Sequence, residues 1–150
     1  MSVAPPDLVF RNVLVAVDGS RDAGLALAAA ILAVQRSHAR MTLLTVAADA
    51  SRTPGAMAVD PLLQDEVDAS AQRHMREALD TVPDDIPVTK LFRHGRPGPE
   101  IVAAAKEGNH DVVFVGARGV GRVHALMGSV SQYVLHHARS TVFVAHAPRD

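Results

Sequence analysis

Five short apolar runs alternate with four helical patterns along this chain of 150 residues, and this alternation constrains the fold more than any other feature. Several runs are almost continuously apolar, as expected for strands that are covered on both faces. The segments between them are long enough to act as crossovers between parallel strands. The sequence therefore predicts one α/β domain with an open, doubly wound, five-stranded parallel sheet and about four helices. The predicted strands are residues 12–17, 41–46, 88–92, 111–115 and 141–145.

The first two helical patterns show apolar residues at helical spacing over residues 23–34 and 63–82. Ser20 is predicted to be the N-cap of the first helix, because its hydroxyl can accept a hydrogen bond from a free N–H of the first turn. Asp22 is predicted to favour that first turn through the helix dipole.

The last two helices are predicted from their terminal residues. The third is predicted to start at Gly98-Pro99-Glu100, with proline at its first position, and to end near Gly108. The fourth is predicted to start at Ser129, which together with Gln132 has the spacing of a capping box.

Composition excludes several classes of function. The 15 Lys and Arg residues nearly balance the 16 Asp and Glu residues, which argues against a nucleic-acid-binding surface. The absence of cysteine excludes disulfides, thiolate zinc sites and cysteine nucleophiles. No apolar run is long enough to cross a membrane, and the first residues lack the pattern of a signal peptide. We therefore expect a cytoplasmic protein.

A glycine-marked segment after the fourth predicted strand has the features of an anion site. The stretch Gly116-Ala117-Arg118-Gly119 follows that strand directly, and Gly128-Ser129-Val130-Ser131 leads into the last helix. Glycine lets the backbone approach a phosphate, and the free N–H groups at a helix start attract an anion. The P-loop signature is absent, since neither Lys90 nor Lys106 follows a glycine.

Asp18 follows the first predicted strand and completes this candidate site. In open parallel sheets, ligands bind beyond the carboxyl ends of the strands, where the strand order reverses. If the first and fourth strands are neighbours, Asp18 faces the glycine segment, where it can accept from ribose hydroxyls or help to hold a metal-phosphate group. The alternative is that Asp18-Gly19 forms only a turn and that the glycines are ordinary loop residues.

From about Arg11 to His146, the chain resembles the universal stress protein family. The resemblance is carried by residues 12–20, 95–101, 111–119 and 128–134, followed by the closing strand at 141–145. The glycine segment resembles the ATP-binding pattern of that family, Gly-x2-Gly-x9-Gly-[Ser/Thr]. Eight residues separate Gly119 from Gly128 in this chain, one fewer than in the pattern.

The resemblance implies the strand order 3-2-1-4-5 and a homodimer that pairs through residues 141–145. That pairing agrees with the residues themselves, because an apolar edge strand needs cover. The domain is predicted to span residues 11–147, after a flexible extension at 1–10.

The resemblance also implies ATP as the ligand, with Mg²⁺ possible through Asp18. Asp18 corresponds to a position near the ribose and the phosphates in ATP-binding members, and the backbone of Val46 corresponds to the adenine contact. The remaining candidate positions of the pocket and phosphate loop are Ala16, Gly116, Ala117, Arg118, Gly119, Gly128, Ser129, Val130 and Ser131.

The leading hypothesis is an ATP-binding stress-response protein that acts through a conformational change or through partners. At most slow ATP hydrolysis is expected, because no positioned base, phosphate-binding lysine or activated nucleophile is found. One alternative is a nucleotide-free dimeric interaction module, which the shorter glycine spacing favours. A binder of cyclic AMP or AMP is another. An adenylyl-transferring enzyme is a third, although the usual His-x-Gly-His and Ser-Gly-Gly-type signatures are absent.

Overall fold

Strands and helices alternate along the whole of the described chain, which in this computed structural model comprises residues 9–50, 61–118 and 127–148. The strands are β1 (Asn12–Ala16), β2 (Arg40–Ala47), β3 (Val88–His94), β4 (Val112–Gly116) and β5 (Thr141–Ala145). The helices are α1 (Arg21–Ser37), α2 (Pro61–Thr81), α3 (Pro97–Glu107) and α4 (Ser129–His137). No helix within these ranges has the length and apolar character that a membrane span requires.

All five strands are parallel and lie in the order β3-β2-β1-β4-β5, as predicted. Val13 of β1 is paired with Met41 of β2 on one side and with Val112 of β4 on the other. The chain therefore winds outward in one direction from β1 to β3 and in the opposite direction from β4 to β5. Its topological switch point lies between β1 and β4, where ligands of open α/β sheets usually bind.

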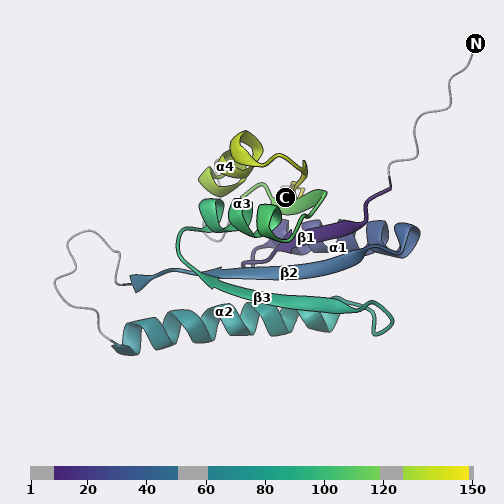
Figure 1. Cartoon of the computed structure of the whole chain (residues 1–150). Helices are drawn as coiled ribbons and strands as arrows, with labels where there is room; N and C mark the ends of the chain where they lie inside the picture. The colour runs from purple at the N-terminus through teal and green to yellow at the C-terminus, as the bar shows by residue number, and fades with distance from the viewer. Residues whose placement is uncertain (1–8, 51–60, 119–126, 149–150) are drawn as a thin grey trace, which may run out of the picture.

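Two separate hydrophobic clusters cover the two faces of the sheet, because side chains alternate along each strand. Val13 and Val15 of β1 point into the cluster shared with α1 and α2, whereas Leu14 points into the cluster shared with α3 and α4. These three side chains are fully buried. In Figure 1, α2 lies on one side of the sheet and α3 and α4 lie on the other. The continuously apolar strands are thus explained by burial on both faces.

The first helix begins as the sequence predicts, whereas the third begins earlier. Ser20 is the N-cap of α1, and its Oγ accepts a hydrogen bond of 3.1 Å from the N–H of Ala23. Helix α3 starts at Pro97 instead of Gly98, with Arg96 as N-cap. The fixed φ of proline and its missing N–H suit Pro97 to this first position. Gly98 then lies within the first turn, where an added Cβ would be 2.9 Å from the ring of Tyr133.

The predicted capping box of the last helix is wrong. Gly128 is the N-cap of α4, and Ser129 is the first helical residue. Gly128 has no side chain to cap this end, and the hydroxyl of Ser131 instead donates toward two backbone carbonyl oxygens, that of Gly128 at 3.0 Å and that of Ala117 at 2.8 Å. Ser131 therefore fastens the start of α4 to the segment that follows β4.

Candidate functional site

A cavity of about 180 Å³ lies where β1, β2 and β4 end, at the switch point of the sheet. Nine of the eleven candidate residues line it, although they come from four separate parts of the chain. They are Ala16, Asp18, Val46, Gly116, Ala117, Gly128, Ser129, Val130 and Ser131. Of the other two, Arg118 is not a lining residue, and Gly119 lies outside the described residues.

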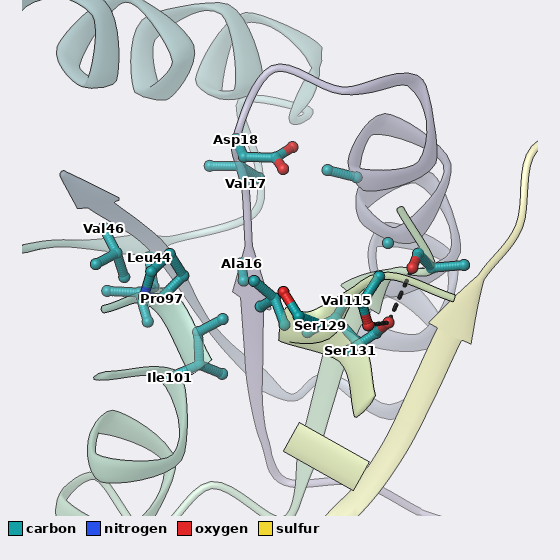
Figure 2. Close-up of a pocket in the computed structure, with 15 residues that line it drawn as sticks. Ala16, Val17, Asp18, Leu44, Val46, Pro97, Ile101, Val115, Ser129 and Ser131 are labelled. Atoms are coloured by element: carbon teal, nitrogen blue, oxygen red, sulfur yellow. Dashed lines mark hydrogen bonds between the residues drawn. The ribbon is translucent and has the colours of Figure 1, made fainter. Parts of the chain in front are cut away.

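One wall of the cavity is apolar, and the start of α4 lies on the opposite side. Figure 2 shows Leu44, Val46, Pro97 and Ile101 gathered on one side, with Ser129 on the other side. Of these four residues, only Val46 was predicted from the sequence to be in the site, because the other three belong to ordinary strand and helix patterns. These apolar residues come together only because the start of α3 packs against the end of β2. The cavity can therefore hold a flat apolar group at one end and an anion at the other.

Asp18 both forms a turn and faces the cavity, so the two interpretations of its motif are compatible. Its Oδ1 accepts a hydrogen bond of 2.9 Å from the N–H of Ser20. Gly19, between them, has a φ of 82°, in the left-handed region that glycine tolerates best. The Asp18 side chain is exposed, and its carboxylate is available to a ligand.

Gly116 is required by close packing inside the protein. A Cβ at this position would lie 2.7 Å from the backbone nitrogen of Ala23 and 2.8 Å from the carbonyl carbon of Asp22. The end of β4 is therefore pressed against the first turn of α1. This contact brings the segment after β4 to the mouth of the cavity.

Both backbone polar groups of Ala117, its N–H and its carbonyl, form hydrogen bonds within the protein. Its N–H donates to the carbonyl oxygen of Ala145 at 2.7 Å, and its own carbonyl oxygen accepts from the N–H of Gly128 at 2.6 Å. The N–H of Gly128 is therefore committed within the protein. Because the first amides of a helix have no partner inside it, the N–H groups of residues 129–131 are the ones suited to an anion.

Arg118 points away from the cavity and pairs with Asp22. Its Nε lies 3.1 Å from Oδ2 of Asp22, and its backbone N–H donates to the same oxygen at 3.0 Å. The other carboxylate oxygen of Asp22 accepts from the N–H of Ala147 at 2.9 Å. Burial alone would raise the pKa of Asp22, but these hydrogen bonds and the charge of Arg118 together lower it below its ordinary value. From the sequence, Asp22 was predicted only to favour the first helical turn, since nothing in its spacing indicates these distant partners.

His94, the last residue of β3, and Pro97, the first residue of α3, make different contacts. Pro97 lines the cavity, whereas His94 does not. The Nε2 of His94 lies 2.8 Å from Oδ1 of Asp68 on α2, and Asp68 also accepts from the side-chain amide of Gln64. His94 therefore joins the end of β3 to α2.

Comparison with known proteins identifies related chains. The model of the universal stress protein family matches residues 10–146. Universal stress protein YxiE of Bacillus subtilis is 28% identical over 136 residues, which cover 84% of this chain and 92% of that protein. Universal stress protein Slr1101 of Synechocystis is 47% identical over 55 residues, which are 36% of this chain. That match spans 51% of Slr1101, so this chain covers only about half of that relative.

Solved structures show the same fold. Universal stress protein UspA from Lactobacillus plantarum is 29% identical, with a TM-score of 0.78, over 93% of this chain and 99% of that one. A universal stress protein solved in complex with cAMP is 23% identical, with a TM-score of 0.70, over 93% of this chain and 99% of the other.

Proposed function

The chain belongs to the universal stress protein family, and from that premise we propose that it binds an adenine nucleotide, with ATP as the leading candidate, in the cavity between β1 and β4. The observation that carries the proposal is the pairing of an apolar slot with the amino end of α4 in one cavity. An adenine ring needs an apolar slot, and phosphates need the free N–H groups at a helix start.

The adenine would lie between the side chains of Val46 and Leu44 from β2 and those of Pro97 and Ile101 from α3. These side chains offer apolar contact to both faces of a flat ring. The carbonyl and N–H groups at the end of β2 can form hydrogen bonds with the edge of the ring, which apolar side chains cannot.

The phosphates would lie at the first turn of α4. The N–H groups of residues 129–131 and the positive end of the helix dipole favour an anion there. Asp18, on the opposite side of the same mouth, carries a negative charge and would repel a bare triphosphate. It would instead accept hydrogen bonds from ribose hydroxyls or approach the phosphates through Mg²⁺.

We further propose that the protein acts as a homodimer whose partners respond to the bound nucleotide. β5 is an edge strand of the sheet, and Phe143 on it is 44% exposed. A second copy of β5 would cover that side chain and the unpaired edge. On its other side, β5 is joined to the cavity wall, because the carbonyl of Ala145 accepts from the N–H of Ala117.

Calorimetric titration of the purified protein with ATP and Mg²⁺ tests the proposal, with AMP and cyclic AMP run in parallel. We expect about one ATP per subunit. Gly128→Val should abolish the heat while leaving the protein folded, because its β-branched side chain would fill the approach to α4. The backbone of Gly128 lies at φ −79° and ψ 168°, which valine adopts without strain.

The alternative functions predict different titrations. Binding of cyclic AMP or AMP with no preference for ATP would assign the cavity to adenine and ribose recognition. No heat and no thermal shift with any nucleotide would refute the proposal and favour a nucleotide-free interaction module.

A further inference from the structure

Asp22 is the only buried carboxylate among the described residues, with 4% of its surface exposed. It joins three segments that are far apart in the sequence. The carboxylate lies in the first turn of α1, and it accepts from the N–H and Nε of Arg118 after β4 and from the N–H of Ala147 after β5. A charge is expensive to bury unless it is paired, so this arrangement needs all of its donors.

The segment held by Asp22 is the wall of the proposed nucleotide site. Arg118 follows directly after Ala117, which lines the cavity and whose carbonyl accepts from both Gly128 and Ser131 at the start of α4. Fixing the N–H of Arg118 therefore fixes the plane of the peptide that carries this carbonyl. Through it, Asp22 influences the placement of the first turn of α4 without touching the cavity's polar end.

We propose that Asp22 is a positioning residue for nucleotide binding, and that Arg118 is its partner and does not bind phosphate. The inference rests on the proposed function, because it concerns the same cavity. Asp22 holds Arg118, Arg118 fixes Ala117, and Ala117 holds the amino end of α4 in the orientation that receives the phosphates.

The surroundings of Arg118 support its role as a structural partner. Its side chain is 11% exposed, and its terminal nitrogen also lies 3.5 Å from the carbonyl oxygen of Ala147. If Arg118 turned toward a phosphate, it would leave Asp22 buried with its strongest partner removed. That cost opposes the movement, whereas the backbone amides of α4 receive an anion without any rearrangement.

Asp22→Asn is the direct test, and Asp111→Asn is the matched control. The carboxylate of Asp111 also accepts two backbone N–H groups, from Arg11 at 2.7 Å and Asn12 at 3.1 Å. It joins the segment before β4 to the start of β1, at the opposite end of these strands from the cavity. Both substitutions remove one charge and keep the shape of the side chain. Only Asp22→Asn acts on the cavity wall.

Hydrogen exchange of the nucleotide-free protein measures the contact itself. We expect faster exchange of the Arg118 and Ala147 amides in Asp22→Asn, whereas in Asp111→Asn those amides should exchange as in the wild type. Equal exchange in all three proteins would overturn the positioning role. Because no nucleotide is present, this result is independent of the proposed function.

ATP titration of the same proteins measures the consequence. We expect the Kd for ATP to rise about 10- to 100-fold in Asp22→Asn, by analogy with outer groups that orient metal ligands, and to stay within about twofold of the wild type in Asp111→Asn. If Arg118 were a phosphate ligand, Asp22→Asn would release it and tighten ATP binding, so a lower or unchanged Kd would overturn the inference. A wild-type protein that binds no nucleotide, with the exchange result as expected, would overturn the proposed function and the nucleotide role of Asp22 but not its structural contact.

Arg118→Lys keeps the test decisive if Asp22→Asn does not fold. Lysine retains the charge but loses the planar fork that meets Oδ2 of Asp22. We expect weaker ATP binding in this variant as well. An unchanged Kd would show that the guanidinium is not needed to hold the Asp22 carboxylate in place, which would overturn the role of Arg118 as its partner.

Discussion

Replacing Gly116 by alanine perturbs the contact that brings β4 against α1, and the cost can be worked out from the structure. The added Cβ would lie 2.7 Å from the backbone nitrogen of Ala23, about 0.7 Å short of the 3.4 Å at which ordinary contact begins. The atoms that it meets are mostly backbone atoms, so no side-chain rotation relieves the clash. Either the end of β4 or the first turn of α1 must move.

Overpacking of this kind typically destabilises a protein by about 1–3 kcal/mol. For a chain of this size, each kcal/mol lowers the melting temperature by roughly 2–4 °C, so we expect Gly116→Ala to melt roughly 2–12 °C below the wild type. The displacement should also weaken nucleotide binding, because Gly116 and Ala117 line the cavity.

Gly24→Ala is the matched control for this experiment. Gly24 lies inside α1, and a Cβ there would have no atom within 4 Å. Alanine in an open helix interior stabilises by about 0.5–1 kcal/mol relative to glycine. Differential scanning calorimetry should therefore show opposite shifts for the two Gly→Ala variants. A Gly116→Ala protein as stable as the wild type would refute the packing argument, because the strand and the helix would then not be in tight contact.

Three further predictions address the ligand, the pH response and the dimer. Asp18→Ala should weaken ATP binding with little change in melting temperature, because the side chain is exposed; an unchanged Kd in calorimetry would remove Asp18 from the site. Burial lowers the pKa of His110 below its ordinary 6.5, so the stability that its neutral form contributes is present above pH 6.5 and is lost as the pH falls through the lowered value. Urea unfolding at stepped pH should show this loss of unfolding free energy in the wild type and a smaller loss in His110→Gln. Identical pH profiles for the two proteins would count against the contribution of His110. Phe143→Asp should raise the dimer dissociation constant in sedimentation measurements, and an unaffected dimer would exclude pairing through β5.

The fold could be predicted from the sequence because its signals are local. Continuous apolar runs identify buried parallel strands, and the caps around Ser20 and Gly108 mark helix ends that the structure bears out to within a residue. The predicted helix start was wrong where tertiary contacts, and not local sequence, determine the end of the helix. Gly128 is the cap of α4 because its N–H bonds to Ala117, eleven residues earlier, and the side chain of Ser129 is left out of the capping.

The site was only partly predictable, because its residues come from separate strands and helices that meet only in the folded protein. Gly116 and Ser129 have local signals in glycine spacing and helix position, and both line the cavity. Leu44 and Ile101 have none, since each belongs to an ordinary apolar stripe. Arg118 was selected because it stands between two glycines, but its orientation depends on Asp22, which is 96 residues away in the sequence.

The shorter glycine spacing can be assessed from the two ends of the segment. Gly116 is pressed against α1, the N–H of Arg118 is held by Asp22, and the N–H of Gly128 is held by Ala117. Ser131 adds a second bond from the first turn of α4 to Ala117. The position of the helix start is thus set by contacts with the end of β4 and not by the number of residues between Gly119 and Gly128. With eight residues between Gly119 and Gly128, the amides at the start of α4 therefore still lie at the cavity, which is why the shorter spacing is compatible with a phosphate site.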